Sequence, residues 1–236
     1  MSIKKLSKSQ VDFFEREGYL VIEGFLSHEK CDYFHSLAKK HADQEHAVIM
    51  NVHKKIEGFY QLIRDPGIVS ILNTLQKGAV MGLSGHYIFK EPKTRYARDT
   101  WYPHQDNSYP RGRKGAYITT NIFLDDTDRE NGTVYVYPRS HQEDLLPFEH
   151  VKSYVGEPDS EGLIHSGQRV EVPSQYAQVD LTMGKGALLI LHGHLIHGSY
   201  PNLSLDRPRP TFAFGYMTVG DTFVEGNSAK REMIHL

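Results

Sequence analysis

The sequence predicts a single domain, residues 1–236, with a mainly β fold braced by α-helices. Helix capping signals and helical spacing of apolar residues are confined to about residues 7–78. From about residue 79 to residue 220, short segments rich in β-branched and aromatic residues alternate with Gly, Pro, Asn and Asp. Strands this frequent, with no helices between them, favour an antiparallel sandwich or jelly roll.

The first predicted helix has both of its ends marked in the sequence. Ser7 and Gln10 form a capping-box pattern, in which each side chain satisfies a backbone N–H group of the first turn. Gly18 is placed to end the helix, because glycine adopts the left-handed conformation common at helix ends. Residues 19–22, Tyr-Leu-Val-Ile, are expected to form a short strand directly after it.

Two further helices are expected before residue 79. Ser27 can cap a second helix, in which apolar residues recur at helical spacing. A third helix has Asp65 as its N-cap, Pro66 in its first turn and Lys77-Gly78 at its end. The three helices together are expected to brace one outer face of the β fold.

The remaining chain contains six predicted strands. Asn131-Gly132 marks a turn into the third of them. Residues 144–176 show no periodic pattern, and a loop of this length is a candidate lid or a surface excursion. The strands are predicted at residues 79–89, 116–124, 133–137, 178–183, 187–191 and 210–219.

Composition and charge exclude several classes of function. The net charge of −2 and the lack of any long run of one charge argue against a nucleic-acid partner. No segment has the apolar length of a signal peptide or a membrane span, and Cys31 is the single cysteine. We therefore expect a cytoplasmic protein, monomeric or homodimeric, whose partner is a small-molecule substrate.

One imidazole and one carboxylate are spaced to bind a single metal ion. His104 and Asp106 would point to the same face of an extended strand, because side chains alternate along it. A third ligand from a distant strand would complete two imidazoles and one carboxylate, with open positions for substrates. Three histidines that lie close together about ninety residues downstream are candidates for it. By alternation, His192 and His194 share one strand face, and His197 lies on the other.

Longer motifs around these residues carry a family resemblance. The chain resembles the phytanoyl-CoA dioxygenase (PhyH) family of iron(II)- and 2-oxoglutarate-dependent oxygenases. The resemblance covers most of the chain. It rests on Glu17-Gly18-Tyr19-Leu20-Val21, Tyr102-Pro103-His104-Gln105-Asp106-Asn107, Phe123-Leu124-Asp125-Asp126, Glu130-Asn131-Gly132, Pro138-Arg139-Ser140-His141 and His197-Gly198-Ser199-Tyr200-Pro201-Asn202.

The resemblance implies a double-stranded β-helix, the cupin-like form of the jelly roll. It also implies that Fe(II) is held by His104, Asp106 and His197, with 2-oxoglutarate and O2 as cosubstrates. Related halogenases have a small residue at position 106, so the aspartate there favours hydroxylation or another oxidation. The implied reaction oxidises a substrate carbon and converts 2-oxoglutarate to succinate and CO2.

The far carboxylate of 2-oxoglutarate requires a cation, and arginine pairs with carboxylates bidentately. Arg207 and Arg209 stand ten and twelve residues after His197, on either side of the spacing usual in the family. Both have the same strand parity, so geometry alone does not separate them. We prefer Arg209 because it directly precedes the strand, and we expect Ser199 to assist through its hydroxyl.

The substrate is expected to be small and polar or anionic. Candidate substrate residues lie near the first metal motif because aromatic rings and arginines gather there. On the preceding strand, either His86 and Ile88 or Tyr87 and Phe89 can face the pocket. The candidates are Arg98, Trp101, Tyr102, Tyr109 and Arg111.

Two other functions fit parts of the sequence. A cupin-like dioxygenase or isomerase would use the metal site without 2-oxoglutarate, and it would not need the arginines after His197. A non-catalytic jelly-roll binding module would be expected to have lost at least one of His104, Asp106 and His197. The sequence leaves the prime substrate and the position of its oxidation undefined.

Overall fold

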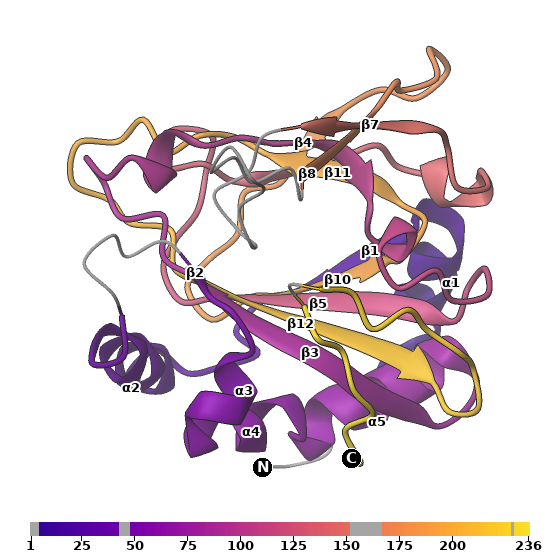
Figure 1. Ribbon diagram of the computed structural model, residues 1–236, viewed down its shortest axis with the longest axis horizontal. Helices are drawn as coiled ribbons and strands as arrows, with labels where there is room; N and C mark the ends of the chain where they lie inside the picture. Colours follow the sequence, from indigo (N-terminus) through magenta and orange to yellow (C-terminus); the bar gives the residue numbers. More distant parts are fainter. Residues whose placement is uncertain (1–4, 43–47, 152–166, 228) are drawn as a thin grey trace.

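Two antiparallel β-sheets lie one above the other in the computed structural model, which describes residues 5–42, 48–151, 167–227 and 229–236 (Figure 1). The larger sheet has six strands in the order β1-β10-β5-β12-β3-β2, and the smaller has four in the order β4-β11-β6-β9. Each pair of neighbouring strands is antiparallel. The predicted β-rich jelly-roll architecture is therefore confirmed.

The strand bounds agree with most of the predicted segments. In the six-stranded sheet they are β1 (Tyr19–Ile22), β2 (Val48–Ile49), β3 (Val80–Ile88), β5 (Tyr117–Phe123), β10 (Leu188–His192) and β12 (Thr211–Thr218). In the four-stranded sheet they are β4 (Trp101–Gln105), β6 (Val134–Val136), β9 (Val179–Asp180) and β11 (Ile196–Ser199). A separate hairpin consists of β7 (Phe148–Val151) and β8 (Gly167–Val170).

The described residues contain five α-helices, and those between β2 and β3 cover the outer face of the six-stranded sheet (Figure 1). Ser7 accepts a hydrogen bond from the N–H of Gln10 and Gly18 is left-handed with φ 83°, which confirms both ends of the first helix. The side chain of Asp65 accepts hydrogen bonds from two N–H groups at the start of the last helix. The helices are α1 (Lys8–Glu17), α2 (His28–Lys39), α3 (Val52–Lys55), α4 (Glu57–Ile63) and α5 (Pro66–Gln76).

The main hydrophobic core lies between these helices and the six-stranded sheet. Alternate residues of β12 project into it, and the rings of Phe212 and Phe59 are 4.0 Å apart. Tyr87 of β3 and Phe89, which directly follows the strand, are also fully buried in this core. His86 and Ile88 therefore occupy the opposite face of β3, which is the face turned towards the smaller sheet.

Several elements differ from their predictions. Helices α3 and α4 were not predicted, because each is shorter than the window in which helical periodicity is visible. The strand predicted at residues 178–183 is limited to β9, after which Met183 forms only an isolated bridge. Strand β11 was also missed, because its four residues contain a glycine and have no alternating pattern.

Residues 144–176 are not a continuous loop. Their described parts contain β7 and β8, which pair antiparallel from Phe148 opposite Val170 to Val151 opposite Gly167. Residues 152–166 lie outside the described residues, so the predicted lid remains a prediction. No helix of the described chain combines the length and apolar character needed to cross a bilayer.

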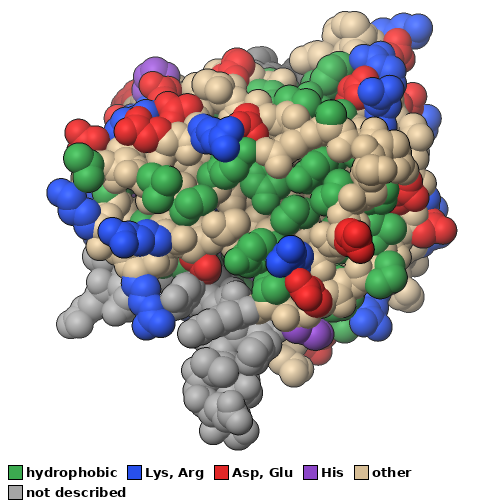
Figure 2. Space-filling view, turned by 90° about the horizontal axis from the view of Figure 1, so that it is seen from above, with side chains coloured by type: hydrophobic (Ala, Val, Ile, Leu, Met, Phe, Trp, Pro, Cys, Tyr) green, Lys and Arg blue, Asp and Glu red, His purple; other side chains and the backbone are tan. Residues whose placement is uncertain are grey.

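The outer face of the four-stranded sheet carries hydrophobic side chains across its middle and charged side chains mainly at its edges (Figure 2). The exposed members on this sheet include Tyr102 of β4 and Val179 of β9, which are 40% and 39% exposed. Single exposed apolar side chains are ordinary on protein surfaces. The polar groups that could carry chemistry lie instead on the inner side of the sheet.

Candidate metal centre and cosubstrate pocket

Strands β4 and β11 place two predicted ligands opposite each other. His104 and His197 are direct partners in the antiparallel register, and their ring centroids are 4.4 Å apart. Both imidazoles are buried, with exposed fractions of 5% and 7%. Two residues separated by almost a hundred positions in the sequence thus come together through one strand pair.

Asp106 completes the group, although it does not lie on the strand as expected. Strand β4 ends at Gln105, and Asp106 begins a short 3-10 turn, η2 (Asp106–Ser108). Its Oδ1 lies 3.3 Å from Nε2 of His104, and its Oδ2 lies 3.6 Å from Nε2 of His197. One ligand atom of each residue lies within 4.8 Å of the other two, so the three side chains converge on one point.

The hydrogen bonds of the two rings leave one nitrogen of each available. Nδ1 of His104 lies 2.7 Å from the carbonyl oxygen of Tyr102, and Nδ1 of His197 lies 3.0 Å from that of Leu195. A carbonyl only accepts, so each neutral ring carries its proton on Nδ1. The Nε2 lone pairs are then directed to the carboxylate, as in metal-binding histidines.

Two amides beside Asp106 fix the turn that presents it. Gln105 donates through Nε2 to the carbonyl of His194 at 2.9 Å, and its Oε1 accepts from the N–H of Leu146 at 2.8 Å. Asn107 donates to the carbonyl of Gly112 at 2.8 Å and accepts from the N–H of the same residue at 3.0 Å. These bonds hold the backbone on both sides of the carboxylate.

The carboxylate is stabilised in its ionised form. Burial alone would raise the pKa of Asp106, but His197, His104 and a hydrogen bond from Thr119 together lower it below its usual range. The hydroxyl of Thr119 donates to Oδ2 at 2.6 Å. Burial lowers the pKa of His197, whereas the contact with Asp106 outweighs burial at His104 and raises its pKa.

The two rival histidines occupy other environments. Gly193 and His194 lie in a turn that takes the chain from β10 in one sheet to β11 in the other. The alternation that related His192 and His194 to His197 therefore does not apply. The ring nitrogens of His194 contact the carbonyl of Glu143 at 3.1 Å and the amide of Asn107 at 3.0 Å.

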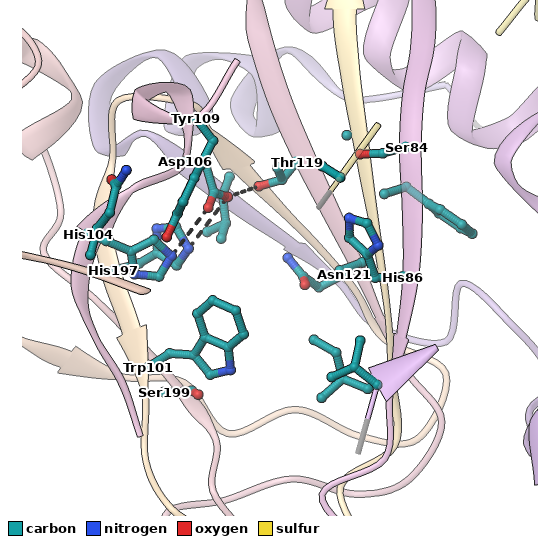
Figure 3. A pocket seen from close by; sticks show the side chains of 18 of the residues that line it. Ser84, His86, Trp101, His104, Asp106, Tyr109, Thr119, Asn121, His197 and Ser199 are labelled. Carbon is teal, nitrogen blue, oxygen red and sulfur yellow. Dashed lines mark hydrogen bonds and ion pairs between the residues drawn. The ribbon is translucent and has the colours of Figure 1, made fainter. Parts of the chain in front are cut away.

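A pocket of about 390 Å³ opens between the two sheets beside this centre. His104 and His197 lie on one side of it, and Ser84, His86 and Asn121 of the six-stranded sheet lie on the other (Figure 3). The structure thereby selects His86 and Ile88, rather than Tyr87 and Phe89, as the face of β3 that lines the pocket. Four predicted residues also line it: Trp101, Tyr109, Ser199 and Arg209.

Arg209 is a buried cation with unused hydrogen-bonding capacity. It is 3% exposed, its Nη1 donates to Oγ1 of Thr211 at 2.8 Å, and its buried Nε has no partner. Burial lowers its pKa to about 10, so it remains charged at neutral pH. Within the described part of the chain, no carboxylate forms an ion pair with it. A buried cation in this state fits an anionic ligand.

Lys90 lies behind Ser199 and was not predicted to belong to the site. It is fully buried, and its Nζ donates to the carbonyls of Asp99 and Tyr200 and, at 3.3 Å, to Oγ of Ser199. Ser199 accepts this bond, so its own proton can be donated to a ligand in the pocket. Lys90 is separated from the metal motif in the sequence, and no local pattern marks it.

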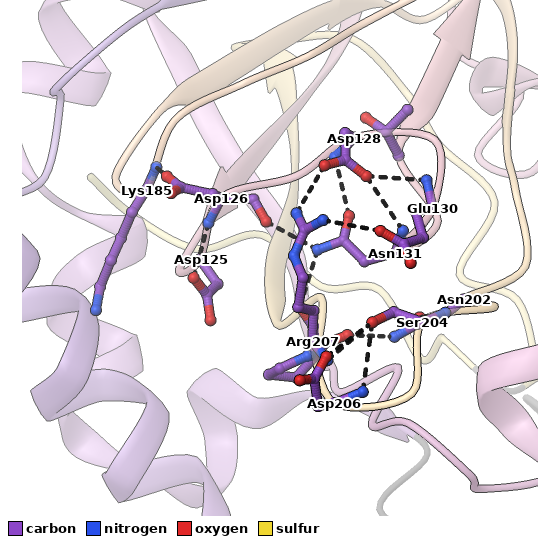
Figure 4. A network of polar contacts seen from close by, with 12 residues as sticks. Asp125, Asp126, Asp128, Glu130, Asn131, Lys185, Asn202, Ser204, Asp206 and Arg207 are labelled. Carbon is purple, nitrogen blue, oxygen red and sulfur yellow. Dashed lines mark hydrogen bonds and ion pairs between the residues drawn. The ribbon is translucent and has the colours of Figure 1, made fainter.

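Arg207 lies outside the pocket and is bound to acidic side chains. Its Nη2 is 2.7 Å from Oδ2 of Asp128, and its Nη1 is 3.3 Å from Oε2 of Glu130 (Figure 4). The amide of Asn202 donates to the carbonyl of Arg207 at 2.8 Å and shapes the same loop. The two arginines, which sequence parity could not separate, therefore have different environments.

The other candidate substrate residues are not in the pocket. Arg98 and Arg111 are exposed, and Tyr102 packs its ring against the guanidinium of Arg169 at 5.5 Å. The pocket instead contains Arg231, which comes from the C-terminal segment, and Gln168 of β8. Neither residue stands in a recognisable motif, so the sequence alone offered no signal for them.

The family model for phytanoyl-CoA dioxygenase (PhyH) matches residues 14–211. A phytanoyl-CoA dioxygenase of Arabidopsis thaliana is 26% identical, with 84% of each protein covered.

Two solved structures have the same fold. The non-heme alpha-ketoglutarate-dependent carbocyclase SnoK from nogalamycin biosynthesis has a TM-score of 0.75 at 20% identity, covering 96% of this chain and 89% of that one. HygX from Streptomyces hygroscopicus, crystallised with nickel and 2-oxoglutarate, has a TM-score of 0.70 at 18% identity, covering 92% and 88%. The chain belongs to the phytanoyl-CoA dioxygenase (PhyH) family of iron- and 2-oxoglutarate-dependent dioxygenases, as its sequence motifs predicted.

Proposed function

We propose that this dioxygenase hydroxylates a carbon of a small organic substrate, with His104, Asp106 and His197 as its Fe(II) ligands. One observation supports the proposal above all others. Two Nε2 lone pairs and one ionised carboxylate converge within 4.8 Å at the wall of a pocket that also contains an unpaired, buried arginine. Two imidazoles and one carboxylate are typical of non-heme Fe(II) oxygenases, in which the other coordination positions remain open.

Arg209 and Ser199 are proposed to bind the far carboxylate of 2-oxoglutarate. A buried guanidinium and a hydroxyl that can donate are complementary to a carboxylate. Lys90 would orient that hydroxyl through the hydrogen bond that it donates to Oγ of Ser199. Arg207 is proposed to have a structural role, because its guanidinium is engaged by Asp128 and Glu130.

When bound, iron and 2-oxoglutarate with O2 would supply an oxidant that can remove hydrogen from an unactivated carbon, and 2-oxoglutarate would become succinate and CO2. The protein's own contribution is to orient and to exclude water. Thr119 holds one carboxylate oxygen of Asp106, and the carbonyls of Tyr102 and Leu195 hold the two rings. Asp106 fills the position that is small in related halogenases, which supports hydroxylation.

The two alternative functions account less well for these contacts. A cupin-like enzyme that does not use 2-oxoglutarate would leave the buried charge of Arg209 without an anionic ligand. A binding module would have no need of two histidines whose Nε2 atoms both face a carboxylate.

Consumption of 2-oxoglutarate tests this function. The purified protein, with Fe(II), 2-oxoglutarate and O2, should release succinate slowly even without its prime substrate, whereas Asp106→Ala should release none above the protein-free background. A matched variant, Asp144→Ala, removes an exposed carboxylate outside the pocket and should behave as wild type. Iron binding without any 2-oxoglutarate consumption would favour the cupin-like alternative.

We also propose that the protein works in the reducing environment of the cytoplasm. Cys31 is a free thiol with no exposed surface, and burial raises its pKa to about 11, so it is unreactive. A monomeric or homodimeric state remains a prediction. Light scattering during gel filtration tests it, and a larger assembly would contradict it.

A further inference from the structure

A second arginine, Arg231, lines the same pocket as Arg209. Its Nη1 donates to the carbonyls of Val224 and Glu225, both at 3.3 Å, and its backbone N–H donates to the carbonyl of Glu225 at 2.9 Å. These bonds fold the C-terminal segment back so that the guanidinium lies at the pocket wall. The segment thus positions Arg231 but uses only one of its three side-chain nitrogens.

The charge of Arg231 is not neutralised by an acidic side chain of the described chain. Its Nε is buried and has no partner. Glu225 contacts it through the backbone carbonyl, and Glu232, the next residue in the sequence, pairs with Lys54 at 3.0 Å. Asp106 is the single carboxylate among the described residues that line the pocket, and it belongs to the metal centre. A half-buried guanidinium in this state fits an anionic ligand.

Two neutral side chains that can donate hydrogen bonds line the pocket together with this cation. Nδ1 of His86 accepts from the N–H of Asn51 at 3.3 Å, so the neutral ring carries its proton on Nε2. Burial, together with the positive charge of the nearby Arg231, lowers the pKa of His86 to about 3, so the ring is neutral at physiological pH. The hydroxyl of Tyr109, which also lines the pocket, is buried without a partner.

A count of charges in the pocket indicates what this cation binds, if the proposed function holds. Fe(II) with Asp106 would carry one net positive charge, and the dianion 2-oxoglutarate with Arg209 would carry one net negative charge. Among the groups that line the pocket these two charges cancel, because metal-bound imidazoles and His86 are neutral; Lys90 lies behind Ser199, outside the lining, and its Nζ is bonded to protein acceptors. Arg231 then leaves a single uncompensated positive charge, which a substrate with one negative charge would neutralise.

Apolar side chains line much of the remaining wall. Val48 is on β2, Met50 lies between β2 and α3, Ile88 is on β3, and Ala213 is on β12. Such a surface binds hydrocarbon rather than polar groups. It would hold the body of a substrate whose charged end is bound elsewhere.

We propose that the substrate is a monoanion, a carboxylate with an apolar body, and that Arg231 binds its carboxylate with the help of His86. This inference rests on the proposed function, since the charge count includes iron and 2-oxoglutarate. Arg231, rather than the exposed Arg98 and Arg111, then provides the selectivity for anions. Arg231 thereby determines which substrates enter, and Arg209 determines which cosubstrate does.

Binding of matched acids and amides tests the proposal without turnover. Trp101 is the single tryptophan of the chain and lines the pocket, so its fluorescence reports ligand binding. The anaerobic protein with Fe(II) and saturating 2-oxoglutarate is titrated with phenylacetate and phenylacetamide, and with hexanoate and hexanamide. We expect at least one acid to bind about tenfold more tightly than its amide. If neither acid is preferred, the proposal is wrong.

Variants then assign the preference to one residue. Arg231→Gln should bind acid and amide about equally, whereas Arg231→Lys, which keeps the charge but not the planar fork, should retain part of the preference. Arg98→Gln removes an exposed arginine outside the pocket and should match wild type. An undiminished preference for acids in Arg231→Gln would overturn the proposal.

Each sample is first checked for the weak visible absorption of the Fe(II)–2-oxoglutarate chelate. If wild type lacks that absorption, the proposed function fails. If wild type has it and Arg231→Gln still prefers acids, this inference alone fails. If Arg231→Gln does not fold, Arg231→Lys decides, because weaker acid binding with unchanged amide binding supports the proposal and unchanged acid binding contradicts it.

Discussion

The turn between β10 and β11 separates two histidine clusters, His104 with His197 and His192 with His194. They look alike in the sequence and differ in chemistry. On one side, His104 and His197 each hydrogen-bond a carbonyl through Nδ1 and direct Nε2 to Asp106. On the other side, Nδ1 of His192 accepts from the N–H of His194 at 3.1 Å, and both nitrogens of His194 have protein partners. Only the first cluster has free lone pairs beside a carboxylate.

The same distinction separates Arg207 from Arg209. Arg207 is bound by two carboxylates at the surface, and Arg209 is buried with an unpaired Nε in the pocket. A side chain whose hydrogen-bonding groups are already satisfied stabilises the fold, whereas one with an unsatisfied buried group can bind a ligand. Spacing in the sequence does not reveal this difference, because it depends on residues far along the chain.

The largest effect is expected when one histidine of each cluster is replaced by alanine and the two variants are compared. His197→Ala should weaken Fe(II) binding by more than about 100-fold, because it removes a direct ligand. His192→Ala, the matched variant, should bind Fe(II) as wild type does. Equilibrium dialysis with metal analysis measures both. Equal loss in the two variants would show that the clusters are not functionally distinct.

The arginine pair is expected to differ almost as much. Arg209→Gln should raise the KM for 2-oxoglutarate about 100-fold, because a buried ion pair with the cosubstrate is lost. Arg207→Gln should change that KM less than about threefold and lower the free energy of unfolding by about 1 kcal/mol, since its ion pairs are half-exposed. Initial rates and urea denaturation measure the two effects. A larger KM effect in Arg207→Gln would reverse the assignment.

A smaller effect is expected from the hydroxyl that holds Asp106. Thr119→Val keeps the side-chain shape but removes the hydrogen bond to Oδ2, so Fe(II) affinity should fall about tenfold. Thr218→Val provides the control, because its hydroxyl bonds a backbone carbonyl outside the pocket. Metal titration of both variants separates the two cases, and an unchanged affinity in Thr119→Val would remove Thr119 from the centre.

The smallest effect on ligand binding is expected at His192, whose burial affects the pH dependence of stability instead. Burial lowers the pKa of His192 to about 3, well below the ordinary value near 6.5. Between these values the unfolded chain binds the proton and the folded chain does not, so stability falls as the pH falls below about 6.5. His192→Gln should reduce that loss by up to about 1.4 kcal/mol per pH unit.

Urea denaturation at pH 7 and pH 5 measures this dependence. His28→Gln, which removes an exposed imidazole on α2, is the comparison variant. The loss of stability between pH 7 and pH 5 should be smaller in His192→Gln than in wild type. In His28→Gln it should equal that of wild type. A profile for His192→Gln that coincides with wild type would show that His192 is not kept neutral by its burial.

Local signals in the sequence predicted the elements that depend on local chemistry. The caps at Ser7, Gly18 and Asp65 were found because each acts within one helical turn. The metal residues were found through family motifs, and spacing alone left His192 and His194 as rivals. Gln105 and Asn107, which fix the turn at Asp106, had no recognised role until their distant partners were placed.

What could not be predicted depends on contacts between distant segments. Lys90 becomes part of the site only because the loop after β3 lies under Ser199. Arg231 reaches the pocket only because the C-terminal segment folds back onto the carbonyls of Val224 and Glu225. Charge near the first metal motif suggested Arg98 and Arg111 instead, since proximity in the sequence was the available guide.

Anaerobic titration of the protein with Fe(II) and 2-oxoglutarate is the decisive experiment for the proposed iron site. We expect a weak visible charge-transfer absorption that saturates at one Fe(II) and one 2-oxoglutarate per chain. This absorption should be lost in His197→Ala and retained in His192→Ala. A folded wild-type protein without the absorption, or a His197→Ala variant that keeps it, would show that His104, Asp106 and His197 do not form the iron site.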